Sequence, residues 1–205
     1  MKKDLIIFDF DGVLADSFDT FYPLIRDGVA HVGLSLTPDQ YRNLFTSNVH
    51  QGFRDFIKDD KKYMAFLEFR SSNYDKYYNA KLFPGVLKFL KTIGKSNVLT
   101  IASSGRQKNI INLLKKNNIR NLFSLIIANG ALSKVEMIKD ILDKFPASLE
   151  KTFFITDTIG DIKVAKKCGL KTIAVTWGFH SEKMLKSANP DFIAKSFKEI
   201  QKILS

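Results

Sequence analysis

The chain has 205 residues, of which 45% are hydrophobic, and its 32 basic and 21 acidic residues give a formal net charge of +11. This hydrophobic share supports a buried core and excludes disorder over the whole chain. The single cysteine, Cys168, excludes an internal disulfide and a cysteine-cluster metal site, and the three histidines are isolated in sequence. No apolar run reaches the roughly 18 residues of a membrane span. Together with the lone cysteine, this leads us to expect a reduced, cytoplasmic protein.

Short apolar segments predict five strands, at residues 5–8, 97–102, 124–128, 152–156 and 172–175. Because these segments are almost wholly apolar rather than alternating, they are typical of parallel strands that are covered on both faces. Helical patterns stand between and after the later strands, at 85–94, 106–117, 134–144, 160–168, 182–187 and 196–204. This alternation predicts an α/β fold with an open sheet and a parallel core.

Residues 16–80 interrupt the alternation, since they are rich in aromatic residues, helical in pattern and without a convincing strand. The segment is too long for a simple crossover between strands, so it predicts an inserted helical domain. The sequence Phe83-Pro84-Gly85 marks the return to the core. We therefore predict a core domain of residues 1–15 and 81–205 and a helical domain of residues 16–80.

The first predicted strand runs into two aspartates and a glycine, Asp9, Asp11 and Gly12. Ligands bind at the carboxyl ends of strands in open α/β sheets, and carboxylates two residues apart on a strand project to the same side. Such a carboxylate can be a nucleophile that becomes an aspartyl-phosphate, and its neighbour can protonate a leaving oxygen and then activate water. The alternative is an ordinary turn at a strand end, where Asp and Gly are common.

Hydroxyl and amino groups follow the next two predicted strands. The hydroxyls of Ser103 and Ser104 could donate hydrogen bonds to a ligand, or one of them could merely cap the helix at 106–117. Ser133 and Glu136 form a capping-box pattern that places Lys134 in the first turn of the next helix. A cation there opposes the helix dipole, which favours an anion nearby. The alternative is one more solvated lysine.

Two acids follow the fourth predicted strand, Asp157 and Asp161, at a spacing of four residues. On a strand end and the next helical turn they could converge on one ion, and Mg²⁺ prefers hard oxygen ligands. The alternative is that these acids only stabilise a helix N-terminus. Four carboxylates close together would repel one another strongly, so the cluster would need a cation.

In this order, the four segments resemble the motifs of the haloacid dehalogenase superfamily, in the subfamily with a helical cap that includes phosphoglycolate phosphatase and β-phosphoglucomutase. The resemblance spans residues 4 to about 180. It implies a Rossmann-like three-layer α/β/α core with a parallel sheet, and an inserted all-helical cap domain. Such caps close over the site, which implies hinges near residues 15–18 and 80–84. Thr156 departs from the family pattern, which often has Gly or an acid there, so this chain has one carboxylate fewer near the metal than some members.

The resemblance also implies the cofactor and the roles of individual residues. Mg²⁺ would be held by Asp9, the main-chain carbonyl of Asp11 and Asp157, with Asp161 as a direct or indirect ligand. Asp9 and Asp11 would be catalytic. Phosphate would be bound by Gly12, Ser103, Ser104 and Lys134.

These roles imply a magnesium-dependent phosphatase that acts on a small phosphorylated metabolite. Dehalogenases and phosphonatases of the superfamily lack an acid at the position of Asp11, so this residue favours a phosphatase or, as the alternative, a phosphosugar mutase. Within the predicted cap, Gly52-Phe53-Arg54 resembles a loop that touches substrate. Arg54 could bind a carboxylate or a second phosphate, or it could be an ordinary surface arginine.

The positive charge permits a further alternative, a non-catalytic or nucleic-acid-binding protein. Residues 81–205 carry 22 basic and 9 acidic side chains, whereas the rest of the chain is close to neutral. The lysines are spread over several predicted helices and are not interleaved with aromatic residues, unlike a nucleic-acid surface. We therefore expect no nucleic-acid or membrane partner, and a monomer or weak dimer.

Overall fold

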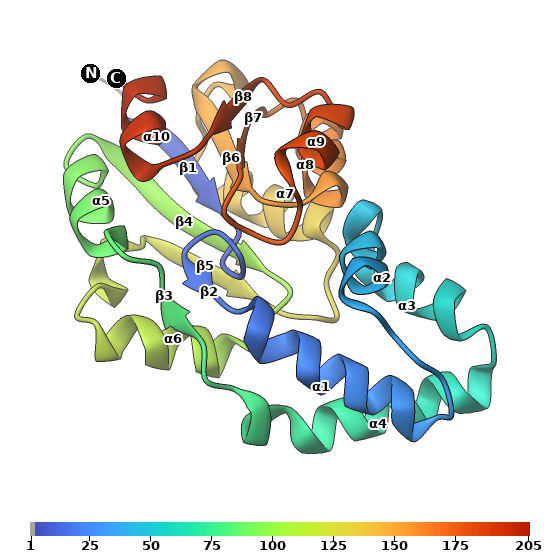
Figure 1. Ribbon diagram of the computed structural model, residues 1–205. Coiled ribbons are helices and arrows are strands. Elements are labelled where there is room, and N and C mark those ends of the chain that lie inside the picture. Colours follow the sequence, from blue (N-terminus) through green and yellow to red (C-terminus); the bar gives the residue numbers. More distant parts are fainter. Residues whose placement is uncertain (1–2) are drawn as a thin grey trace. The chain divides into compact units, whose positions relative to one another are not determined.

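A six-stranded parallel sheet organises the larger of two units in the computed structural model, which describes residues 3–205 (Figure 1). This core unit consists of the chain up to Asp16 together with Lys81–Ser205, and Ser17–Ala80 form a separate helical unit. The strand order is β5-β4-β1-β6-β7-β8. The strands are β1 (Asp4–Phe8), β4 (Asn97–Ser103), β5 (Leu125–Ala128), β6 (Thr152–Thr156), β7 (Lys171–Val175) and β8 (Phe192–Ala194).

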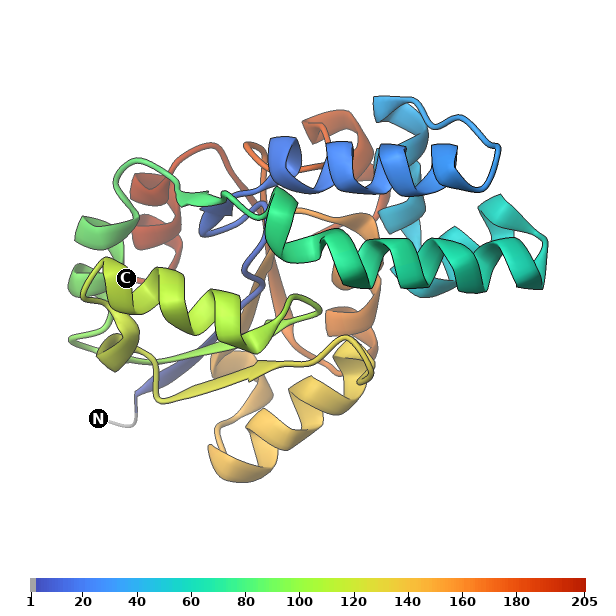
Figure 2. The ribbon, with the colours of Figure 1, turned by 90° about the horizontal axis from the view of Figure 1, so that it is seen from below.

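Helices cover both faces of the sheet (Figure 2). One face carries α5 (Val86–Ile93), α6 (Gln107–Lys116) and α10 (Phe197–Ile203), and the other carries α7 (Lys134–Lys144), α8 (Ile159–Lys167) and α9 (Glu182–Ser187). Single turns of 3₁₀ helix, η2 (Arg120–Leu122) and η3 (Leu149–Lys151), precede β5 and β6. The predicted α/β class and its parallel sheet are confirmed.

Strand β1 shows why the central strands are apolar throughout. Leu5 and Ile7 pack in a cluster with Met137 of α7 and Phe154 of β6. Phe8 points to the opposite face, where its ring meets those of Phe89 and Phe123 edge to face at 6.1 and 6.3 Å. Since side chains alternate along a strand, a strand that is buried on both faces needs an apolar residue at every position.

Three strands escaped prediction because each is very short. Strand β8 has three residues, pairs with β7 and lies at the edge of the sheet. Strands β2 (Ala15–Asp16) and β3 (Lys81–Leu82) have two residues each and form an antiparallel pair, which the Phe83 N–H extends by donating to the Leu14 carbonyl at 3.0 Å. Two residues carry no readable alternation, although the predicted hinges fall on these segments.

The helical unit contains α1 (Phe18–His31), α2 (Pro38–Asn43), the 3₁₀ turn η1 (Leu44–Thr46), α3 (Val49–Ile57) and α4 (Asp60–Tyr77). Helices α1 and α4 pack closely at Gly28, where a Cβ atom would come within 3.2 Å of the Phe66 ring. The Tyr77 hydroxyl donates to Asp27 Oδ2 at 2.7 Å and joins the same two helices. Within residues 3–205, none of the helices combines the length and hydropathy that crossing a bilayer would require.

Candidate active site

The candidate residues gather where the three central strands end. Strands β4, β1 and β6 are neighbours in the sheet. After β1 the chain forms β4 and β5 on one side of β1, and it then crosses to the other side to form β6. Such a switch in strand order opens a crevice at the carboxyl edge of the sheet. Asp9 directly follows β1, Ser103 ends β4 and Asp157 directly follows β6. The Asp9 N–H still donates to the Ile155 carbonyl of β6 at 2.9 Å, so Asp9 is fixed to the sheet.

Lys134 bridges two of the predicted acids. Its Nζ lies 3.0 Å from Asp9 Oδ1 and 3.0 Å from Asp161 Oδ2, and it donates to the Ala102 carbonyl at 3.0 Å. The predicted capping box is confirmed, and it makes Lys134 the first residue of α7. Burial alone would lower the pKa of Lys134, but the charges of Asp161 and Asp9 outweigh it and raise that pKa. Lys134 is therefore a fixed cation at neutral pH.

Asp9 is a carboxylate that burial makes costly to ionise. Its side chain is 13% exposed, and its Oδ1 accepts hydrogen bonds from Lys134 and, at 2.8 Å, from the Phe10 N–H. Burial raises the pKa of Asp9 to about 7, with smaller upward contributions from Asp161 and Asp11, and Lys134 opposes the rise. A second cation at this site would favour the ionised form.

Asp157 is fully buried, and its two carboxylate oxygens have different surroundings. Oδ2 accepts the Phe179 N–H at 2.6 Å. Oδ1 has no hydrogen-bond partner among the described residues. Burial, followed by the charge of Asp9, raises the pKa of Asp157 well above its ordinary value.

Gly12 and Gly178 let the backbone approach the Asp157 carboxylate. A Cβ atom on either glycine would collide with Asp157 Oδ2. Gly12 also has a φ of 75°, and its N–H donates within the turn to the Ala15 carbonyl at 2.8 Å. The structure thus uses the Gly12 amide in the turn, and its predicted contact with phosphate stays a prediction.

The replacement Gly12→Ala is expected to destabilise the protein by at least about 2 kcal/mol more than Gly33→Ala, because overpacking against a buried group adds to the backbone strain. Gly33 has the same φ of 75°, but a Cβ atom added to it would meet nothing within 4 Å, so it reports the backbone strain alone. Chemical denaturation of the two variants measures the difference. Equal losses of stability in the two variants would show that the close approach of Gly12 to Asp157 does not require a glycine.

Ser103 and Asp11 lie beside one glycine. The Ser103 Oγ accepts the Gly105 N–H at 3.0 Å. A Cβ atom on Gly105 would lie 3.0 Å from Asp11 Oδ2 and 3.3 Å from the Ser103 Oγ. Ser103 is buried and Ser104 is exposed. The alternative in which one of them caps the helix is wrong, since α6 begins after Arg106 with no side-chain cap.

Two threonines that the sequence did not single out for binding order the loop around Asp161. The Thr156 hydroxyl accepts the Thr158 N–H at 3.2 Å and donates to Asp161 Oδ2 at 3.4 Å. Thr158, rather than an acid, is the N-cap of α8, and its hydroxyl accepts the Asp161 N–H. The departure from the family pattern at Thr156 therefore supplies a hydrogen bond to Asp161 in place of a carboxylate.

His180 is the other residue that sequence reasoning missed. It is 1% exposed, and its Nδ1 accepts the N–H of Ile159, the first residue of α8, at 3.0 Å. The main-chain N–H of His180 donates to the Asp157 carbonyl at 3.3 Å. No local pattern marks this histidine, because its partners lie about twenty residues earlier in the chain.

The predicted substrate residues of the helical unit have structural contacts inside that unit. Phe53 is 3% exposed and its ring lies 5.1 Å from that of Phe66. A Cβ atom on Gly52 would come within 2.5 Å of the Leu44 carbonyl oxygen. Arg54 pairs with Asp60 at 2.9 Å and lies over the Tyr63 ring. Contact of these three residues with substrate stays a prediction.

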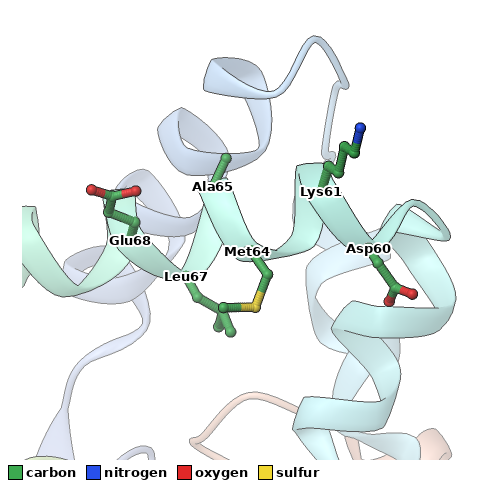
Figure 3. A pocket seen from close by; sticks show the side chains of 6 residues that line it. All are labelled: Asp60, Lys61, Met64, Ala65, Leu67 and Glu68. Atoms are coloured by element: carbon green, nitrogen blue, oxygen red, sulfur yellow. The ribbon is translucent and has the colours of Figure 1, made fainter.

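A shallow hollow on α4 contains none of the candidate residues (Figure 3). It is lined by side chains of this one helix, among them Met64, which is 62% exposed. The candidate catalytic residues lie instead at the carboxyl edge of the sheet.

The side chains at that edge fit a magnesium ion. Within residues 3–205, no three His, Cys, Asp or Glu side chains form a ready cage for a metal. Mg²⁺ needs fewer, since it usually keeps several waters and takes one or two carboxylates. The raised pKa values of Asp9 and Asp157 and the unpartnered Asp157 Oδ1 are features that a bound cation would compensate. The donors are hard oxygens, as Mg²⁺ prefers.

Known proteins resemble this chain in sequence and in fold. The model of the haloacid dehalogenase-like hydrolase family matches residues 6–175. A phosphoglycolate phosphatase of Synechococcus elongatus is 27% identical over 93% of this chain and 92% of its own length. The pyrophosphatase PpaX of Oceanobacillus iheyensis is 24% identical over 98% of this chain and 96% of its own.

Two solved structures show the same fold. A haloacid dehalogenase-like family hydrolase from Streptococcus pneumoniae superposes with a TM-score of 0.86 at 23% identity, over 100% of this chain and 99% of that one. A hydrolase from Pseudomonas syringae gives 0.84 at 18% identity, over 99% and 100%. The family model covers residues 6–175, which include Asp9, Ser103, Lys134 and Asp157, and this match identifies the chain as a member of the haloacid dehalogenase-like hydrolase family.

Proposed function

We propose that this hydrolase is a magnesium-dependent phosphatase that hydrolyses a small phosphorylated metabolite through an aspartyl-phosphate on Asp9. The observation that carries the proposal is the buried Asp9 at the end of β1, held at 3.0 Å by Lys134 beside Asp161. The phosphatase names of the relatives support it. A carboxylate fixed in this way, next to a permanent cation, is suited to attack phosphorus.

In the proposed reaction, Asp9 Oδ2 attacks phosphorus, while Lys134 and the Phe10 N–H orient the carboxylate through Oδ1. Lys134 stabilises negative charge on the transferred group, and Ser103 and Ser104 hold its oxygens. A magnesium ion held by Asp9, the Asp11 carbonyl and Asp157, with Asp161 next to it, would neutralise charge on the phosphate. These contacts position the phosphate and reduce the repulsion between two anions.

Asp11 is the proposed general acid and base. Its carboxylate lies beside Gly105 and Ser103, at the predicted phosphate site. It protonates the leaving oxygen in the first step and takes a proton from water in the second, and this water hydrolyses the aspartyl-phosphate. The helical unit would act as a cap that excludes bulk water, and the lysine-rich core surface would attract anionic substrates.

Purified protein is expected to release phosphate from p-nitrophenyl phosphate with Mg²⁺ and to lose this activity in EDTA. On phosphate esters of alcohols, Asp11→Asn should lower kcat by about 10²- to 10⁴-fold, because the alkoxide then departs unprotonated. A panel of phosphosugars, phosphoglycolate, pyrophosphate and nucleotides identifies the substrate class. Activity that persists in EDTA, or full activity in Asp11→Asn, would refute the mechanism.

Incubation with β-glucose 1-phosphate tests the alternative. Formation of glucose 6-phosphate would identify a mutase, whereas free phosphate alone would exclude it. Arg54→Ala, assayed on the preferred substrate, tests whether the helical unit contributes to substrate recognition.

A further inference from the structure

The two oxygens of the Asp157 carboxylate differ in their contacts. Oδ2 is held by the Phe179 N–H at 2.6 Å and enclosed by Gly12 and Gly178, whereas Oδ1 is buried without a hydrogen-bond partner among residues 3–205. An unpaired buried oxygen of this kind is costly. The arrangement leaves one oxygen of Asp157 for a cation, provided that the Phe179 amide stays in place.

The segment that carries the Phe179 amide is anchored at both ends. Before it, the Trp177 indole N–H donates to the Val13 carbonyl at 3.2 Å. After it, His180 binds the main chain between β6 and α8 at two points. Its main-chain N–H donates to the Asp157 carbonyl, and its ring Nδ1 accepts the Ile159 N–H. The Ile159 N–H belongs to the first turn of α8 and has no partner within the helix.

We propose that His180 is a positioning residue for the metal site. By accepting the Ile159 N–H, the ring locks the start of α8 to the 177–180 segment and keeps the Phe179 amide on Asp157 Oδ2. Oδ1 is then the oxygen presented to Mg²⁺. This inference rests on the proposed function. Partners that orient a metal ligand in this way usually contribute about 10- to 100-fold to metal affinity.

The test is a Mg²⁺ titration of the protein without substrate. Trp177, the single tryptophan of the chain, reports binding by fluorescence, and the Mg²⁺-dependent rise in melting temperature gives an independent reading. His180→Leu keeps much of the side-chain volume but removes the acceptor, so the Mg²⁺ concentration at half-saturation should rise about 10- to 100-fold. His180→Asn places an oxygen near the position of Nδ1 and should bind within threefold of wild type.

Asp191→Ala is the matched control. Asp191 Oδ2 accepts the Thr172 N–H at 2.8 Å near the start of β7, so this variant also removes the side-chain acceptor of one main-chain amide, but at the opposite end of the strand. Its Mg²⁺ affinity should stay within twofold of wild type. Wild-type affinity in His180→Leu, or an equal loss in His180→Leu and Asp191→Ala, would overturn the proposal.

If His180→Leu does not fold, His180→Asn and His180→Gln decide the matter, since the glutamine oxygen reaches beyond the position of Nδ1. Tighter Mg²⁺ binding by the asparagine variant supports the proposal, and equal weakening of both overturns it. Failure of the proposed function would be seen separately, as wild-type protein that binds Mg²⁺ but releases no phosphate. Wild-type protein that binds no Mg²⁺ would overturn both.

Discussion

Asp9→Asn is expected to lower the rate of phosphate release by at least about 10³-fold. The metal-free variant is nevertheless expected to be at least as stable as wild type at pH 8. The loss of activity follows because an amide cannot replace the carboxylate nucleophile. The retained stability follows from the burial of Asp9 and from the repulsion by Asp161 and Asp11, which together raise its pKa to about 7. Phosphate release and urea denaturation in EDTA measure the two effects.

The pH dependence of this stability has a definite sign. The pKa of Asp9 is raised in the folded state from an ordinary value of 3.8, so the folded protein binds this proton more tightly than the unfolded chain does. The resulting stabilisation is fully present below about pH 4 and is lost as the pH rises to about 7. The loss is at most about 4 kcal/mol for a shift of this size. An asparagine does not ionise and avoids that loss.

Without metal, the difference in free energy of unfolding between Asp9→Asn and wild type should therefore shift in favour of the variant as the pH rises from 5 to 8. Asp140→Asn, at an exposed position on α7, is the control and should change neither activity nor this pH dependence. An active Asp9→Asn enzyme would contradict the proposed nucleophile. A folded variant that is clearly less stable than wild type at pH 8 would contradict the electrostatic account.

Lys134→Met is expected to lower both activity and stability. It removes the cation that lies 3.0 Å from Asp9 and from Asp161, and leaves the buried Asp9 and the partly buried Asp161 without it. Breaking a buried pair by removing one partner costs about 3–5 kcal/mol, and activity should fall by at least about 10³-fold. The pKa of Asp9 should rise further, because Lys134 opposes the effect of burial.

Denaturation and kinetic assays measure both effects. Lys139 is exposed on the same helix, so Lys139→Met is the control and should behave like wild type. The double variant with Asp9→Asn should recover part of the lost stability, since it removes one of the two carboxylates that have lost their cation. Strict additivity of the two substitutions would show that Asp9 and Lys134 do not interact.

Much of the fold followed from local patterns. The apolar segment before Asp9 predicted a strand that is buried on both faces, and the structure has β1 there. Ser133 and Glu136 predicted where α7 begins, which placed Lys134 in its first turn. These patterns could be interpreted because caps and burial periodicity act over a few residues of chain.

The tertiary structure decided how the acids are oriented. The sequence placed Asp157 after a strand, but not which of its oxygens is bound, because the Phe179 amide comes from a loop 22 residues later. His180 looked isolated until the parallel pairing of β7 beside β6 brought the segment after β7 to the start of α8. Such bonds join main chain to side chain across neighbouring strands, so they depend on sheet register, which no local spacing encodes.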